Sequence, residues 1–160
     1  MSASLEICVS NQHPALPFDE AWLESLMGDA LEACLAQPGS HPERMVLPVL
    51  DELDVALVDD ETIADVHVRF MDIPGETDVI TFDHGEIVIS LDTAQRYAKE
   101  FGNGFVEEVA RYAVHGLLHL NGHEDAEEGE RAAMHREQER ILAESLARVA
   151  PYPASSGDEG

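Results

Sequence analysis

The chain has 160 residues, 44% of them hydrophobic, which fits one globular domain with a core of its own. Its 33 acidic residues outnumber its 9 basic residues, and a formal net charge of -24 excludes a surface that attracts polyanions over its whole extent. Two cysteines are too few for a disulfide framework, and no signal peptide or membrane-spanning run is seen, so we expect a cytoplasmic protein without membrane contact.

The hydrophobic pattern predicts strands interleaved with helices. In chain order, these are a strand over Leu5–Val9, a helix over Glu20–Ala36, a strand over Leu53–Val58, a helix over Asp60–Phe70, strands over Thr77–Phe82 and Glu86–Ser90, and helices over Thr93–Glu100, Phe105–Leu120 and Glu127–Val149. Asp92 is the expected cap of the third helix. This order favours an α/β (α+β) domain over residues 1–149, with a small mixed four-stranded sheet covered by about five helices. Residues 150–160 are expected to form a disordered tail.

The segment HGLLHLNGHED, from His115 to Asp125, has the spacing of a metal site on a central helix. His115 and His119 are four residues apart, so both imidazoles lie on one helix face and can bind one ion. Gly122 favours the end of the helix, because glycine easily adopts the left-handed conformation. The resulting turn can return Asp125 to the histidines. Two imidazoles and a carboxylate with one open position are typical of catalytic zinc.

Two alternatives remain open for this site. His123 is a rival to Asp125 as the third ligand, although it follows Gly122 directly and leaves little chain for a return. A set of two histidines and one carboxylate also suits iron(II), so Zn²⁺ is the expected ion, with Fe²⁺ or another divalent metal as the alternative.

Gly116 separates this motif from the common zinc peptidases. In those enzymes a glutamate follows the first histidine and acts as the general base. Glycine has no side chain for that role, so the sequence disfavours the standard peptidase mechanism. A metal-bound water with a pKa of about 7 would still permit hydrolysis of another substrate.

Three blocks of the chain resemble the signatures of the YbeY family of bacterial endoribonucleases. Thr77–Phe82 (TDVITF) is similar to the family block TDVLSF, and Gly85–Ser90 (GEIVIS) is similar to GDIxIS. The third block resembles HGxLHLxGYDH and matches it at His115, Gly116, Leu118, His119, Leu120 and Gly122. The order and spacing of all three agree over roughly residues 50–145, but His123, Glu124 and Asp125 stand where the family usually has Tyr, Asp and His.

The resemblance implies a metal-dependent, single-strand-specific endoribonuclease that acts in 16S rRNA 3′-end maturation and ribosome quality control. By position, His115, His119 and Asp125 would hold the ion and carry the catalysis. The implied partners are single-stranded RNA or rRNA and the ribosome or its associated proteins, and the oligomeric state stays open. The alternatives are a metallohydrolase or metallopeptidase of another substrate, and a non-catalytic ribosome-associated metal-binding factor.

Few side chains of this acidic chain could contact RNA phosphate. The family tends to have an arginine shortly before the TDV block; the aligned residue here is Met71, and Arg69 is the nearest guanidinium and a weak catalytic candidate. Further candidates for phosphate contact are Arg96, Lys99, Arg111, Ser90 and Thr81, and candidates for orienting a ligand imidazole are Glu107 and Glu108.

The acidity favours a protein adapted to concentrated salt, with a generally acidic cytosolic protein as the alternative. At roughly 1 M salt the Debye length falls to about 3 Å, which screens most of the self-repulsion of such a surface. We therefore expect the melting temperature to rise as salt increases from dilute buffer to molar concentration. Full stability and activity in dilute buffer would contradict this expectation.

Overall fold

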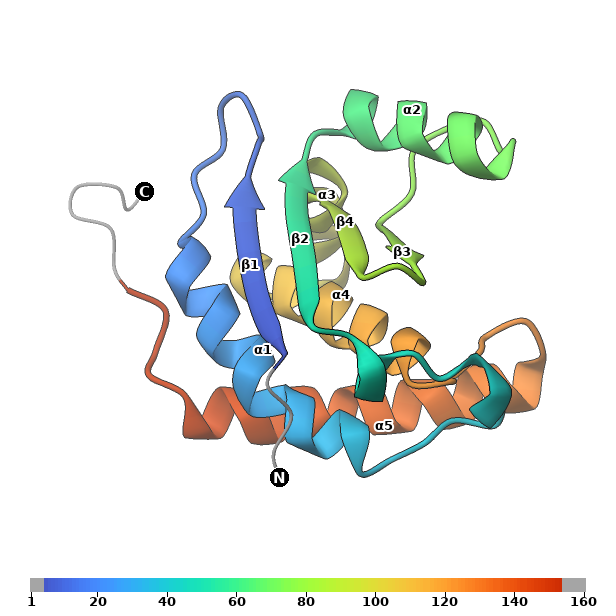
Figure 1. The fold of residues 1–160 in the computed structure, drawn as a ribbon. Coiled ribbons are helices and arrows are strands. Elements are labelled where there is room, and N and C mark those ends of the chain that lie inside the picture. Colours follow the sequence, from blue (N-terminus) through green and yellow to red (C-terminus); the bar gives the residue numbers. More distant parts are fainter. Residues whose placement is uncertain (1–4, 154–160) are drawn as a thin grey trace.

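Four strands form one mixed sheet in the computed structural model, which describes residues 5–153 (Figure 1). The strands are β1 (Glu6–Asn11), β2 (Glu52–Val58), β3 (Val79–Phe82) and β4 (Glu86–Ser90). Their order is β1-β2-β4-β3; β1, β2 and β4 are parallel, and β3 runs antiparallel to β4 at one edge. The predicted small mixed sheet is confirmed.

Helices cover the sheet as the sequence predicted. Within residues 5–153 the α-helices are α1 (Glu20–Leu35), α2 (Asp60–Met71), α3 (Leu91–Phe101), α4 (Phe105–Leu120) and α5 (Glu128–Arg148), with short 3₁₀ turns at Pro42–Arg44 and Leu47–Val49. None of these helices combines the length and the apolar character needed to cross a membrane.

The start of α3 differs from the prediction. Ser90, not Asp92, is the N-cap, and its hydroxyl accepts a hydrogen bond from the backbone N–H of Thr93 at 3.1 Å. The Asp92 carboxylate instead accepts from the backbone N–H of Asp60 at 2.9 Å and lies 2.8 Å from the His13 ring. The prediction of Asp92 as the cap was wrong because its carboxylate binds Asp60 and His13, which are distant in sequence and cannot be inferred from helix periodicity.

Side-chain alternation along the strands gives the sheet two unequal faces. Leu53, Val55 and Leu57 of β2 belong to the main hydrophobic core, which also contains residues of α1, α4 and α5. Val58 belongs to a second, smaller cluster with Ile63 of α2. The main core therefore lies on the face covered by α1 and α4, with α5 packed outside them (Figure 1).

α4 is the central helix of the main core and lies against β3 and β4 as well as α1, α3 and α5. Gly116 lies where α4 packs tightly against the sheet, because a Cβ atom there would lie 2.6 Å from Cδ1 of Ile87 on β4. The glycine that follows the first histidine thus faces the sheet. Its small size sets the distance between the sheet and the helix that carries both histidines.

Replacing Gly116 with alanine is expected to destabilise the fold. The added methyl group meets Cδ1, Cγ1 and Cγ2 of the fully buried Ile87 at 2.6 to 3.1 Å, so either the Ile87 side chain or the helix must shift. We expect a net loss of about 1–2 kcal/mol, the overpacking penalty exceeding the helix-propensity gain. Urea denaturation measures this loss.

The matched control is Gly28→Ala. Gly28 is exposed on α1 and an added Cβ would have nothing within 4 Å, so a gain of about 0.5–1 kcal/mol in stability is expected. Equal effects of the two substitutions would contradict the packing argument.

The chain after α5 remains ordered as far as it is described. The ring of Tyr152 packs edge-on against Phe18 and Trp22, with ring centroids 5.3 and 5.2 Å apart, and its hydroxyl accepts from the backbone N–H of Asp19 at 2.9 Å. Residues 150–153 therefore differ from the predicted disordered tail, because an aromatic ring fixes them to α1. Residues 154–160 of that prediction lie outside the described residues.

Candidate metal centre

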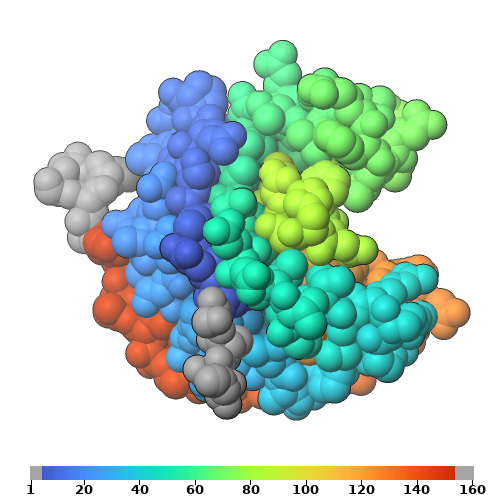
Figure 2. All heavy atoms as spheres, viewed as in Figure 1, coloured from blue at the N-terminus to red at the C-terminus, as the bar shows by residue number. Residues whose placement is uncertain are grey.

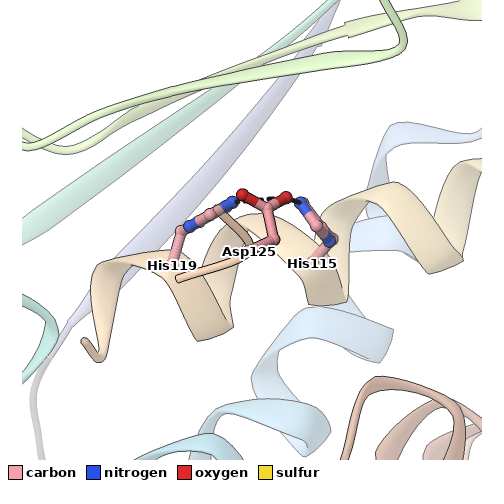
Figure 3. Close-up of side chains that lie close together, drawn as sticks. All are labelled: His115, His119 and Asp125. Carbon is pink, nitrogen blue, oxygen red and sulfur yellow. Dashed lines mark ion pairs between the residues drawn. The ribbon is translucent and has the colours of Figure 1, made fainter. Parts of the chain in front are cut away.

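His115, His119 and Asp125 come together on one side of α4 (Figure 3). An oxygen of the Asp125 carboxylate, Oδ2, lies 3.7 Å from Nε2 of His115 and 3.7 Å from Nε2 of His119. One ligand atom from each residue fits within 4.8 Å of the others, so the three could share one ion. Figure 3 shows the carboxylate between the two rings, as the i, i+4 spacing and the turn predicted.

Gln138 of α5 orients the ring of His115. Its side-chain oxygen Oε1 accepts from Nδ1 of His115 at 2.8 Å, while its Nε2 donates to Glu139 at 3.0 Å, which fixes the orientation of the amide. Because Oε1 only accepts, Nδ1 carries the proton and Nε2 presents its lone pair toward Asp125. Such a partner for the distal nitrogen is the usual support of a histidine that binds metal.

His123 supports His119 through its backbone, and its ring faces another partner. The carbonyl oxygen of His123 accepts from Nδ1 of His119 at 2.9 Å, so Nε2 of His119 is left as a lone-pair donor. The ring of His123 is buried, and its Nε2 donates to the backbone oxygen of Gln37 at 2.7 Å. The alternative that His123 is the third ligand is therefore wrong. The turn directs the His123 side chain to Gln37, and His123 is not part of the cluster.

A tight turn after α4 brings Asp125 back, and the segment 37–46 holds that turn. Gly122 has a φ of +91°, which favours glycine, and its carbonyl accepts from the backbone N–H of His41 at 3.0 Å. Gly39 donates to the carbonyl of Asn121 at 3.0 Å, and a Cβ on Gly39 would lie 2.2 Å from the Gly122 carbonyl carbon. The buried Asn121 side chain donates to the carbonyl of Cys34 at 2.7 Å, so the end of α1 holds the turn together with the segment 37–46.

Burial keeps His115 in the form that binds metal. Its pKa is lowered first by burial and next by the neighbouring His119, although Gln138 and Asp125 oppose this shift. A neutral imidazole offers its lone pair, whereas the imidazolium has none to offer. The side chains of His115, His119 and Asp125 are 24%, 22% and 43% exposed, so the cluster is open to solvent on one side.

A cavity of about 270 Å³ adjoins the cluster and is lined by residues of α3, α4, α5 and the start of β3, with His115 and Asp125 among them. Tyr97, Tyr112 and Met134 supply apolar surface, and Asp78, Glu108, Arg111, Arg131 and His135 supply charge or hydrogen-bonding groups. In Figure 2 the surface is notched between α2 and the segment 37–50, with the β3–β4 hairpin at the back of the notch. The cavity, rather than this notch, gives the cluster room for a substrate group beside it.

Arg69 and Arg96 form ion pairs away from the cluster. Arg69 is exposed on α2 and binds Asp65 one turn earlier at 3.1 Å, so it makes an ordinary surface pair and does not line the cavity. Arg96 binds Asp60 and lies 3.6 Å from Glu76. Ser90 is buried, and its hydroxyl donates to Asp60 at 2.7 Å, so it is not a free phosphate contact.

Arg111 lies in the cavity wall, but its guanidinium forms ion pairs with three glutamates. It makes two hydrogen bonds to Glu139, at 2.7 and 3.0 Å, and further contacts with Glu107 and Glu108. The sequence offers Glu107 and Glu108 as candidates for orienting a ligand imidazole. The structure instead places them on Arg111, because the guanidinium is their nearest cationic partner, and Gln138 takes the supporting role.

Substituting Gln138 by leucine is expected to weaken metal binding while keeping the fold. Leucine fills a similar volume but cannot accept from Nδ1 of His115, so the ring loses its fixed orientation. Loss of such a support typically reduces metal affinity by about 10–100-fold. A zinc titration followed by calorimetry measures the change. Gln138→Glu retains an acceptor for Nδ1 of His115 but places a carboxylate against Glu139, so it should keep more of the metal affinity than Gln138→Leu while losing stability. Unchanged affinity in the leucine variant would show that Gln138 does not support the site.

Comparison with known proteins agrees with the resemblance in the sequence. The family model described as Endoribonuclease YbeY matches residues 8–145. Proteins named Endoribonuclease YbeY from Thermobifida fusca and Mycolicibacterium smegmatis are each 33% identical; the first match covers 87% of this chain and 93% of that protein, and the second covers 73% and 77%. The solution structure of TM1509 from Thermotoga maritima has the same fold, with a TM-score of 0.58, 23% identity and 89% of each chain covered.

Proposed function

The chain belongs to the YbeY family of endoribonucleases, and from that premise we propose that it cleaves single-stranded RNA with a divalent ion, preferably zinc, held by His115, His119 and Asp125. The proposed role is 16S rRNA 3′-end maturation and ribosome quality control in the cytoplasm. The observation that carries the metal-dependent part is the approach of one Asp125 oxygen to 3.7 Å from both Nε2 atoms.

The donor set fits a divalent ion. Both imidazoles have their Nδ1 protons taken by oxygen acceptors, at 2.8 and 2.9 Å, so both Nε2 atoms are free to bind. Asp125 adds one negative charge, which favours a cation between the three residues. An ion bound there supplies a water of lowered pKa and an electrostatic partner for the charge that develops on the phosphate.

The protein's own residues set the geometry of this chemistry. The α4 helix holds the two imidazoles on one face, and Gln138 and the His123 carbonyl keep them from rotating. The segment 37–46 holds the turn that presents Asp125. The cavity beside the cluster offers the open side on which a phosphodiester can approach.

The peptidase alternative finds no support in the surroundings of Gly116. A side chain at that position would meet Ile87 of β4 rather than the histidines, so there is no space for the glutamate base of the common zinc peptidases. A non-catalytic metal-binding factor differs from the proposal in one measurable property, since it would keep the ion without cleaving RNA.

The test is RNA cleavage by the purified chain with zinc, with iron(II) and after removal of metal by a chelator. The expected result is endonucleolytic cleavage of a single-stranded oligonucleotide that disappears with the chelator and returns when metal is added. A base-paired duplex and a casein peptide substrate are the controls, and neither should be cleaved. Cleavage of peptide but not of RNA would reverse the assignment, and tight metal binding without any cleavage would favour the non-catalytic factor.

A further inference from the structure

Most of the positive charge of this chain is already bound to carboxylates. All 9 basic residues lie within the described residues 5–153. The arginines that form ion pairs with Asp or Glu there are Arg44, Arg69, Arg96, Arg111, Arg140 and Arg148. Within that part of the chain Arg131, Arg136 and Lys99 form none. A phosphate group therefore has few free cations to bind.

Arg131 is the unpaired arginine beside the cluster of His115, His119 and Asp125. It lies in the first turn of α5, and its Nη1 donates to the backbone oxygen of Asp125 at 3.0 Å. That contact fixes the guanidinium next to the residue whose carboxylate faces both histidines. Arg131 also lines the cavity that contains His115 and Asp125. Its remaining N–H groups have no carboxylate partner within residues 5–153.

The other cations do not combine these two properties. Arg111 lines the same cavity, but Glu107, Glu108 and Glu139 occupy its guanidinium. Arg136 lies five residues further along α5 and lines a different hollow, with Gly39 and Glu137. Lys99 is exposed on α3 and lines neither space. Among the described cations, only Arg131 is both unpaired and in the wall of the cavity beside the cluster.

We propose that Arg131 binds the scissile phosphate of the RNA, an assignment that rests on the proposed function. A guanidinium offers two parallel N–H donors that match two oxygens of a phosphodiester, which a compact ammonium cannot do. With Nη1 oriented by Asp125, the other N–H groups can reach into the cavity toward a phosphate held next to the cluster.

This placement explains how so acidic a protein binds a polyanion. RNA affinity arises from cations that displace counterions from phosphates, and a net charge of -24 opposes it. In the cavity the Glu108 carboxylate shares the Arg111 guanidinium with Glu107 and Glu139, and Asp78 has no ion pair in the described chain. Arg131 and the bound ion are then the positive charges that face the substrate. Binding is local, at one or two phosphates, and does not need a basic surface.

The test compares Arg131→Ala with Arg136→Ala, which removes the same charge from the same helix five residues further along. Each variant is loaded with zinc and assayed for cleavage of single-stranded RNA. Binding of a single-stranded RNA oligonucleotide is measured separately on the metal-free variants, which should not cleave it. We expect Arg131→Ala to weaken oligonucleotide binding and kcat/KM about 10–100-fold, as loss of charge-assisted hydrogen bonds does. The slope of log affinity against log salt should fall by about 0.7, the value for one phosphate of a single strand.

Metal affinity and thermal stability, which should both be unchanged in Arg131→Ala, separate phosphate binding by Arg131 from a purely structural role. Arg131→Ala should bind zinc as tightly as the wild-type chain, Arg131→Lys should recover part of the loss, and Arg136→Ala should change binding less than about twofold. Equal effects of the two alanine variants would overturn the assignment while leaving the nuclease proposal standing. If the wild-type chain binds the oligonucleotide without cleaving RNA and Arg131→Ala still loses binding, the phosphate role stands and the nuclease proposal fails. No binding by the wild-type chain would overturn both.

Discussion

Replacing His119 by alanine is expected to remove metal binding and RNA cleavage together while the fold is kept. The variant loses one of three ligand groups, and zinc affinity should fall by at least about 100-fold, beyond the effect of a lost supporting residue. The side chain of His119 is partly exposed, and the loss of its hydrogen bond to the His123 carbonyl should cost only about 1 kcal/mol of stability without metal. Zinc titration, circular dichroism and RNA cleavage measure the three properties.

The control for this substitution is His84→Ala. His84 lies on the exposed turn between β3 and β4 and pairs with Glu86, so its removal takes away an imidazole without affecting the cluster. It should keep the metal affinity and the cleavage rate of the wild-type chain. If His119→Ala lost the metal but cleaved RNA at the normal rate, the ion would be structural and catalysis would have to be sought elsewhere.

The second large effect is expected at Asp125, where this chain departs from the family pattern. Asp125→Asn keeps the size of the side chain but removes its charge, and a neutral amide is a poor ligand for zinc. Metal affinity and cleavage should both fall by about 100-fold or more. Asp125→His restores the residue type that the family usually has there, so it should bind zinc within about tenfold of the wild-type chain.

The same two variants report on metal choice. Two histidines and a carboxylate suit iron(II) as well as zinc, whereas three imidazoles without a carboxylate are typical of zinc. A competition titration with both metals should therefore give a higher preference for zinc in Asp125→His than in the wild-type chain. Wild-type affinity in Asp125→Asn would show that Asp125 is not a ligand, and the cluster would then be incomplete.

The sequence was sufficient for the features that depend on neighbouring residues. The spacing of His115 and His119 within an apolar helical run predicts that both rings share one face, and the turn at Gly122 predicts the return of Asp125. The strands and helices follow in the same way from local periodicity. Each of these features arises from interactions within one or two turns of helix or a few residues of strand, so the pattern along the chain carries them.

The partners that complete the site are distant in sequence, and no local pattern points to them. Gln138 comes from the next helix, and its amide looks like any other polar residue on a helix until it is seen 2.8 Å from His115. The segment around Gly39 reads as a helix end, yet its backbone N–H groups bind the carbonyls of the turn after α4, which lies far along the chain. Such contacts exist only after the chain is packed.

By itself the sequence determined which residues can bind a metal, because ligand chemistry and helical spacing are local properties. Only the tertiary structure decided which of these residues meet and which cations stay free. Burial and hydrogen bonding turn the ring of His123 away from the cluster and toward Gln37. Ion pairing, which depends on every carboxylate within reach, occupies Arg69, Arg96 and Arg111 and leaves Arg131 beside Asp125.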